Sequence, residues 1–204
     1  MPDDRHHADT DRTGPDGGGV GASVGEATSR AMLLGPAEIG APGWSIVEER
    51  VWPTGGLDST SGKSKRALQA GCITVWRSKA RADPTRSAWV EVVPYASAED
   101  ALVSLRQVPT FFVGTGPADE EIEWERTVDD LVVPGVADTW IFEKSTTAPS
   151  GKSHARYVGG TVHHTLFLVC LSDPVAARPW EEVVAVATMQ ADRIREALRV
   201  SPPG

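Results

Sequence analysis

Cysteine and long apolar runs are both scarce in this chain. Its 204 residues include two cysteines, Cys72 and Cys170, which could form one disulfide or remain two thiols. The sequence alone does not show whether their Cα atoms come within the roughly 5.5 Å that a bridge needs. No apolar stretch approaches the roughly 20 residues that cross a bilayer, so no membrane span is expected. The first residues lack the basic and apolar regions of a signal peptide, which by default predicts a cytoplasmic location.

Positive charge is also in short supply. The chain carries 20 Lys and Arg residues against 28 Asp and Glu residues, a formal net charge of -8, and no stripe of basic residues is visible. Nucleic acids and anionic membranes are bound through concentrated Lys and Arg side chains. We therefore expect no nucleic acid as a partner, and instead a small ligand or a protein of unknown identity.

Recognisable catalytic and metal-binding motifs are missing as well. The stretch Gly62-Lys63-Ser64 ends like a phosphate-binding loop, but Leu57 stands where that loop requires its first glycine. His163 and His164 are adjacent, so on a strand they would point to opposite faces and would not share a metal ion. No Gly-x-Ser-x-Gly elbow is present. We therefore expect no cofactor, no metal and no catalytic residue, and interpret the chain first as a protein that is not an enzyme.

Tryptophan, in contrast, is abundant. Seven of the 13 aromatic residues are Trp, an excess that fits two interpretations. These residues could form a stacking surface for an apolar or sugar-like ligand, or they could simply pack in the core and rim of a β-rich domain. The candidate ligand-binding residues are Trp76, Trp89, Trp124 and Trp140.

The order of the expected elements predicts an α+β fold, with a mainly antiparallel sheet packed by helices. Residues 1–27 lack apolar periodicity and predict a disordered tail, followed by a single domain over residues 28–204. Short helices are expected over 28–34 and between Ser97 and Pro109, and a long amphipathic helix over 180–199. Strands are expected over 45–52, 71–78, 86–93, 121–128 and 136–146, and within the apolar run 156–171.

Local patterns add detail to two of these strands. Alternation over 121–128 places Ile122, Trp124 and Val128 on one side of a strand, and glutamates on the other. Gly159-Gly160 fits either a tight hairpin turn or a bulge within a longer strand.

Acidic residues concentrate near the strand expected over 121–128. A solvated face is the ordinary interpretation, and a site for a cation or a basic peptide is the alternative. The patch consists of Asp119, Glu120, Glu121, Glu123 and Glu125.

Short motifs spread over residues 28–200 resemble one known family. They are Leu-Leu-Gly-Pro-Ala-Glu-Ile-Gly at 33–40, a strand led by Cys72, Val-Glu-Val-Val at 90–93 before Ser-Ala-Glu-Asp-Ala at 97–101, Arg-Tyr-Val-Gly-Gly at 156–160 and Ala-Asp-Arg-Ile at 191–194. Together they resemble the PknH-like extracellular sensor domain of actinobacteria, which is found on receptor kinases and as secreted or lipid-anchored proteins.

The resemblance implies a cleft in an antiparallel sheet flanked by helices, and a ligand-sensing role without a catalytic motif. It also implies an extracellular location and disulfides, often two. The chain departs from the family here, because Cys72 and Cys170 permit one bridge at most and no signal segment is present. An extracellular location would require that the start of the chain is incomplete.

Three functional hypotheses follow. The first is a non-catalytic, sensor-like domain that binds a small ligand or a protein partner in a sheet cleft partly lined by Trp. The second is an enzyme, for example a hydrolase, built around His154, His163 or His164 and a carboxylate. The third is a cytoplasmic interaction module whose acidic patch meets a basic partner.

Overall fold

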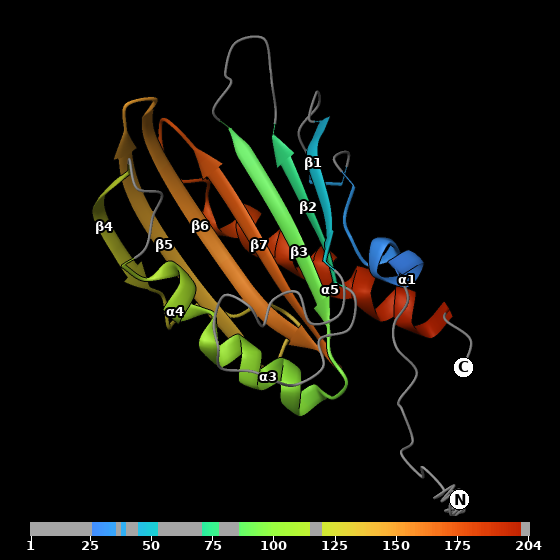
Figure 1. The fold of residues 1–204 in the computed structure, drawn as a ribbon. Coiled ribbons are helices and arrows are strands. Elements are labelled where there is room, and N and C mark those ends of the chain that lie inside the picture. The colour runs from blue at the N-terminus through green and yellow to red at the C-terminus, as the bar shows by residue number, and fades with distance from the viewer. Residues whose placement is uncertain are drawn as a thin grey trace, which may run out of the picture.

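The computed structural model describes residues 26–35, 38–39, 45–52, 71–77, 86–114 and 120–200. The predicted disordered tail falls almost entirely on residues 1–25, which lie outside the described residues. Within the described part, the predicted α+β fold class is confirmed, because a single antiparallel sheet packs against helices that include a long C-terminal one (Figure 1).

The sheet has seven strands in the order β1-β2-β3-β7-β6-β5-β4, and every neighbouring pair is antiparallel. The strands β3 and β7, far apart in the sequence, are neighbours near the middle of the sheet. The strands are β1 (Ser45–Trp52), β2 (Gly71–Arg77), β3 (Ser87–Pro94), β4 (Glu121–Thr127), β5 (Thr139–Ala148), β6 (Gly151–Val162) and β7 (Thr165–Asp173).

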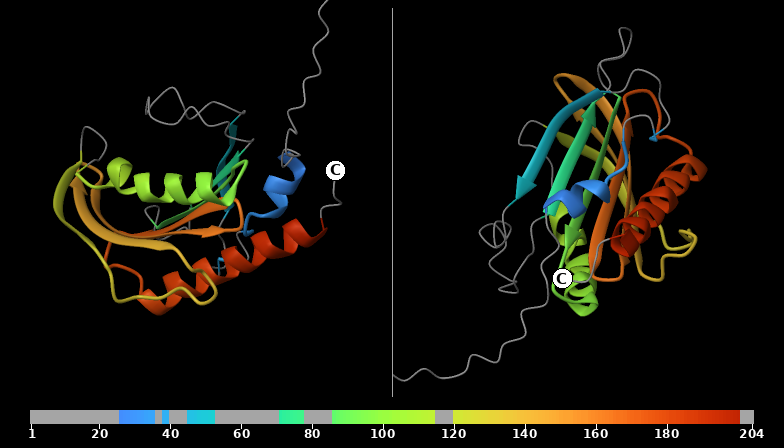
Figure 2. Two further views of the ribbon diagram at one scale, coloured as in Figure 1. Left: turned by 90° about the horizontal axis from the view of Figure 1, so that it is seen from below. Right: turned by 90° about the vertical axis from the view of Figure 1, so that its right-hand side faces the viewer.

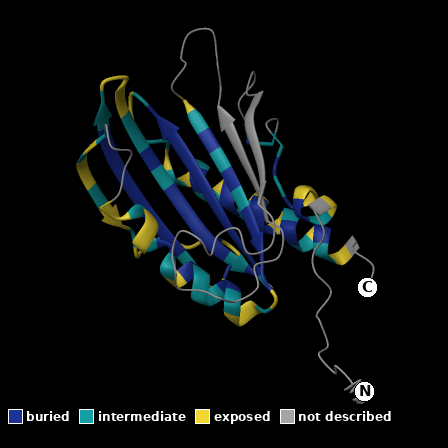
Figure 3. Cartoon of the chain, viewed as in Figure 1, coloured by how far each residue is buried: buried dark blue, intermediate teal, exposed yellow. Residues whose placement is uncertain are grey.

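Helices cover the two faces of the sheet. The helices α3 (Ala98–Gln107) and α4 (Pro109–Phe112) lie on one face, called here the α3 face, whereas α5 (Trp180–Val200) lies on the other, the α5 face (Figure 2). The short helix α1 (Glu26–Ala31) contacts α5, β2 and β3. β7 is buried along its whole length, because helices cover both of its faces and the strands β3 and β6 flank its edges (Figure 3).

Period-two alternation along the strands divides the apolar side chains into two clusters. One lies between the sheet and α5, and includes Val90, Val92, Ile141, Val158, Phe167, Val169, Val183, Ala187, Ala191 and Ile194. The other lies between the sheet and α3, and includes Val93, Trp140, Phe142, Tyr157, Leu166, Leu168, Cys170, Ala101 and Leu105. The predicted amphipathic helix is confirmed, since α5 presents one apolar face to the first cluster.

The start of α3 follows directly from its sequence. Ser97 has an extended backbone, and its hydroxyl oxygen accepts a hydrogen bond from the backbone N–H of Asp100 at 3.1 Å. Such an N-cap satisfies one of the N–H groups that the first helical turn leaves without a partner. Glu99 and Asp100 add negative charge near the positive end of the helix dipole. The predicted short helix is therefore confirmed.

The glycine pair does not form a turn or a bulge, and both predictions for it are wrong. Gly159 and Gly160 lie within β6, which pairs in unbroken register with β5 and β7. Close packing explains the two glycines, because a Cβ at Gly160 would lie 2.8 Å from the Phe167 ring. The chain instead reverses after Val162, where His163 takes a positive φ of 53°.

A β-bulge changes the predicted faces of β4. The register shifts between Ile122 and Trp124, so that Ile122 lies opposite Thr146 while Trp124 lies opposite Ser145. Adjacent residues of β5 point to opposite faces. Ile122 and Trp124 are therefore on different faces, and the prediction that they share one is wrong. The extra residue at the bulge is Glu123.

The two cysteines lie in strands that are not neighbours. Cys72 is opposite Val92 in the β2–β3 pair, whereas Cys170 is opposite Trp89 in the β3–β7 pair. With β3 between them, the usual strand spacing separates their Cα atoms by at least about 9.6 Å. A disulfide requires a Cα separation below about 7 Å. This arrangement does not accommodate a Cys72–Cys170 bridge, and Cys170 is a free, buried thiol.

Candidate functional site

Five aromatic side chains gather on the α3 face and are called here the aromatic cluster. Phe112 of α4 lies between two of the predicted tryptophans, since its ring stacks on Trp89 at 6.0 Å between centroids and contacts Trp140 at 5.5 Å. Trp140 in turn stacks on Phe142 at 5.2 Å, and Tyr157 contacts all four of the other rings. The cluster therefore joins β3, β5, β6 and α4 through ring contacts.

Polar groups border this cluster on the sheet side. The Tyr157 hydroxyl and the Trp89 indole N–H neighbour the buried thiol of Cys170 and partly offset the effect of burial on its pKa. Burial raises the pKa of Cys170 to about 12, and burial also raises the pKa of Tyr157. Both groups therefore stay neutral at physiological pH. The ammonium nitrogen of Lys144 lies 5.8 Å from the centre of the Tyr157 ring, within the range of a cation–π interaction.

A pocket of about 410 Å³ opens beside this cluster and is called here the α3 pocket. It lies between α3 and the residues that lead into β5. Five of its eight lining residues are apolar, and one cationic and one anionic side chain lie at the rim. The lining residues are Leu102, Leu105, Arg106, Pro109, Asp138 and Trp140, with Ala137 and Thr139.

In this region, the indole N–H of Trp140 is a hydrogen-bond donor that has no partner in the described part of the chain. The residue is only 8% exposed, and its indole Nε1–H has no hydrogen-bond acceptor among the described residues. A Cβ at Gly159 would lie 3.6 Å from the Cε3 atom of Trp140, so the indole packs closely against β6. A buried donor in this state costs about 1–3 kcal/mol.

Glu91 is a titratable residue on the α3 face that sequence reasoning missed. It lies in β3, two residues after Trp89 and directly opposite Leu168 of β7. Burial raises the pKa of its carboxyl from 4.5 to about 7. The signal was present in the sequence, as a single acidic residue within the apolar strand Trp89–Val93.

The four predicted ligand-binding tryptophans do not form one surface. Trp89 and Trp140 belong to the aromatic cluster, where Phe112 connects them. Trp124 does not, because the bulge in β4 places it opposite Ser145 on the α5 face, where it is 43% exposed. Trp76 lies in β2 opposite Ala88, and its side chain lies outside the described part of the structure.

The register places His154 in a row with a serine and an aspartate. His154 of β6 lies opposite Ser145 of β5 and opposite Asp173 of β7. These two neighbours interact with residues other than His154. Ser145 donates a hydrogen bond to Glu123 at 2.9 Å, and Asp173 forms an ion pair with Arg86 at 2.8 Å. The row therefore lacks the hydrogen bonds from serine to histidine and from histidine to aspartate that define a nucleophile activated by a base.

The other two histidines lie at the far end of β6, in the turn before β7. Burial lowers the pKa of His164, and the neighbouring His163 lowers it further. The backbone carbonyl of His164 accepts a hydrogen bond from the N–H of Tyr95 at 2.8 Å. The structure does not bring the three histidines into one site. Across the described ranges, no group of three or more His, Cys, Asp or Glu side chains could hold a metal ion.

Two glutamates of the acidic patch, Glu123 and Glu125, are held by internal contacts. Lys152 donates to the Glu123 carboxylate at 2.5 Å, and Thr147 and Ser145 donate to it as well, which lowers its pKa to about 2. The Glu125 carboxylate accepts the backbone N–H of Gly114 at 2.9 Å. Both glutamates therefore fix local structure around β4, in addition to any contact with a partner. Asp119 lies outside the described residues.

Comparison with known proteins relates the fold, and not the sequence, to a characterised domain. No protein-family model and no curated protein matches the chain. Among solved structures, the extracellular domain of PknH from Mycobacterium tuberculosis matches with a TM-score of 0.61 and 11% sequence identity, over 86% of this chain and 99% of that domain. None of the described helices is both long enough and apolar enough to cross a membrane. The chain therefore shares its fold with an extracellular domain of PknH.

Proposed function

We propose that this domain is a non-catalytic, sensor-like module that binds a small, mainly apolar ligand in the α3 pocket. The fold similarity to the PknH extracellular domain is compatible with such a role. The pocket volume of about 410 Å³ falls within the usual range of ligand sites, which is about 300–1,000 Å³. Five of its eight lining residues are apolar and the rest are polar or charged, and ligand sites typically combine apolar residues with a few polar groups.

The unpartnered Nε1–H of Trp140 is the observation that carries the proposal. Buried polar groups in folded proteins nearly always have a partner, and an exception requires an explanation. The indole lines the pocket, and a ligand whose carbonyl or ether oxygen reaches the buried Nε1–H through a small shift of the ring would supply the missing acceptor. The ligand class that we infer is therefore a small apolar molecule that carries one such oxygen, with its apolar part against Leu102, Leu105 and Pro109.

Matched fragment pairs test this proposal. We would titrate the protein with acetophenone and ethylbenzene, and with cyclohexanone and methylcyclohexane, and measure affinities by calorimetry. A hydrogen bond worth about 0.5–1.5 kcal/mol predicts that each ketone binds roughly 2- to 12-fold more tightly than its hydrocarbon.

Two substitutions sharpen the result. Trp140→Phe keeps an aromatic ring but removes the donor, so it should abolish the preference for the ketones. Trp124→Phe is the matched control, because Trp124 lies on the other face of the sheet and should leave the preference unchanged. Equal affinities for ketone and hydrocarbon in the unaltered protein, or a ketone preference that survives in Trp140→Phe, would refute the proposal.

A further inference from the structure

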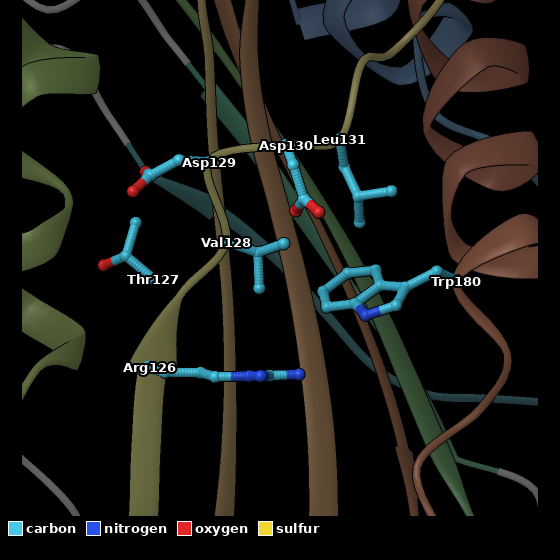
Figure 4. Close-up of a pocket in the computed structure, with 7 residues that line it drawn as sticks. All are labelled: Arg126, Thr127, Val128, Asp129, Asp130, Leu131 and Trp180. Carbon is cyan, nitrogen blue, oxygen red and sulfur yellow. The ribbon is translucent and has the colours of Figure 1, made fainter.

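A second pocket, of about 260 Å³, lies on the α5 face and is called here the α5 pocket. It is bounded by the end of β4, by the segment that follows it, and by the first residue of α5 (Figure 4). In the close-up, the Arg126 side chain extends across one side, and the Asp130 carboxylate points toward the space between Val128 and Trp180. The side chains of Thr127 and Asp129 point away from that space.

The arginine side of this pocket has an excess of positive charge. The carboxylate of Glu143, which is 2% exposed, accepts hydrogen bonds from Arg126 at 2.5 Å and from Arg156 at 2.7 Å. Two guanidinium groups thus share one carboxylate, so these three side chains together carry one net positive charge. Arg156 is largely buried, with 17% of its side chain exposed, whereas Arg126 is 65% exposed. The excess charge is therefore accessible at Arg126.

Arg126 also keeps free donors for a ligand. Its Nε and Nη2 atoms both contact Oε1 of Glu143. A guanidinium has five N–H donors, so these contacts leave both N–H groups of Nη1 available. The buried carboxylate fixes the orientation of the guanidinium, which reduces the entropy lost when a ligand binds.

The opposite side of the pocket carries negative charge. Asp130 is exposed and lines the same space. Among the described residues, Arg126 forms an ion pair with Glu143, and no ion pair joins Arg126 to Asp130. A cation and an anion therefore border one small pocket without a direct ion pair between them.

An aromatic and aliphatic wall completes the site. The Trp180 indole lines the pocket together with Val128 and Leu131. Arg156 stacks on the same indole at 4.4 Å and holds the ring in place. Because Arg156 is itself bonded to Glu143 and to the carbonyl of Arg178, the wall and the cationic side belong to one connected structure.

We propose that the α5 pocket binds a small zwitterion of the α-amino acid type with an apolar side chain. The ligand carboxylate would accept hydrogen bonds from Nη1 of Arg126, the ammonium group would donate to Asp130, and the side chain would pack on Trp180, Val128 and Leu131. This inference does not depend on the α3 pocket, which lies on the opposite face of the sheet.

Charge-deleted probes test it directly. Calorimetric titrations would compare L-valine, L-leucine and L-phenylalanine, and then compare L-leucine with N-acetyl-L-leucine and with L-leucinamide. The first derivative removes the ammonium charge and the second removes the carboxylate charge. Each should bind at least about tenfold more weakly than leucine, because hydrogen bonds to charged groups are the stronger ones. No binding of any of the three amino acids at millimolar concentration would overturn the proposal.

Two neighbouring aspartates provide a matched pair of variants. Asp130→Asn should weaken leucine binding about tenfold and remove the difference between leucine and N-acetyl-leucine. Asp129→Asn should change neither quantity, because the Asp129 side chain points away from the pocket. Equal effects of the two substitutions would overturn the proposal, since they would indicate general electrostatics in place of a direct contact.

Arg126 provides an independent test. Arg126→Gln should remove the difference in affinity between leucine and leucinamide. Arg126→Lys should retain part of that difference, and because it keeps the charge it also controls for loss of folding. Trp140→Phe should leave leucine binding unchanged. A loss of leucine binding in Trp140→Phe would overturn the assignment of the amino acid to the α5 pocket, and would leave the proposal for the α3 pocket to its own test.

Discussion

The ring of Phe112 stacks on the indole of Trp89, with centroids 6.0 Å apart and planes inclined by 16°. This contact joins α4, a helix of four residues, to β3 at the middle of the sheet. A helix this short has no independent stability, so its position depends on such contacts. The wall of the α3 pocket is therefore positioned partly by the aromatic cluster, because Pro109 belongs to the same short helix.

Replacing Phe112 tests this dependence. We expect Phe112→Ala to lower the free energy of unfolding by about 2 kcal/mol, less than for a fully buried phenylalanine because Phe112 is partly exposed. The matched control is Phe111→Ala, since Phe111 is 50% exposed and should cost less than about 1 kcal/mol. Chemical denaturation measures both values. Equal losses in the two variants would contradict the anchoring role of Phe112.

Gln190 should contribute strongly to holding the segment that directly follows α1. Its side chain, fully buried, donates to the Met32 carbonyl at 2.5 Å and accepts from the Leu34 N–H at 3.2 Å. Gln190→Leu preserves approximate size but leaves both backbone groups unpaired, which should cost about 2–4 kcal/mol. Met189→Leu, at a neighbouring and 40% exposed position, should change stability by less than about 0.5 kcal/mol.

Hydrogen exchange provides a local measurement for the same prediction. In Gln190→Leu the amide of Leu34 should exchange faster than in the unaltered protein, relative to amides in β7. Unchanged protection of Leu34 would show that the Gln190 side chain does not hold this segment.

The pH dependence of stability should include a contribution from Glu91. The pKa of this carboxyl is about 7 in the folded state and near 4.5 in the unfolded state, so the folded state binds its proton more tightly. The resulting stabilisation is fully present below pH 4.5 and is lost as the pH rises through 7. The predicted loss is about 3 kcal/mol. Glu91→Gln should remove this slope; a slope that persists in the variant must arise from other groups.

Both cysteines should be free thiols. The strand order separates Cys72 from Cys170, and burial raises the pKa of the Cys170 thiol to about 12. Alkylation of the denatured protein without prior reduction should therefore add two labels, as measured by intact mass. In the native protein Cys170 should resist labelling, because the reactive thiolate is neither populated nor accessible. A mass that shows two labels only after reduction would contradict the strand arrangement.

Local signals in the sequence were sufficient for much of the fold. The strand 45–52 was predicted with the bounds that the structure shows, and the helix after Ser97 was predicted from its cap and its apolar spacing. These features depend on residues close together in the chain. The sheet order, which places β3 beside β7, depends on contacts between distant segments and could not be read from such patterns.

The candidate site was less predictable for the same reason. Trp124 was grouped with Trp89 and Trp140 on composition, but one extra residue in β4 moves it to the other face, and strict alternation cannot reveal a bulge. Phe112, which connects Trp89 and Trp140, lies in a short segment without periodicity. The unpartnered Nε1–H of Trp140 depends on what surrounds the residue in space, which the sequence does not contain.

The most direct test of the account is the nuclear magnetic resonance signal of the Trp140 indole N–H during titration with acetophenone. The signal is assigned by its absence in Trp140→Phe. We predict a downfield proton shift that saturates with ligand and that ethylbenzene does not reproduce, while the indole signal of Trp124 stays in place. A Trp140 signal that does not move, or that moves equally with ethylbenzene, would contradict the proposal that this donor binds a ligand in the α3 pocket.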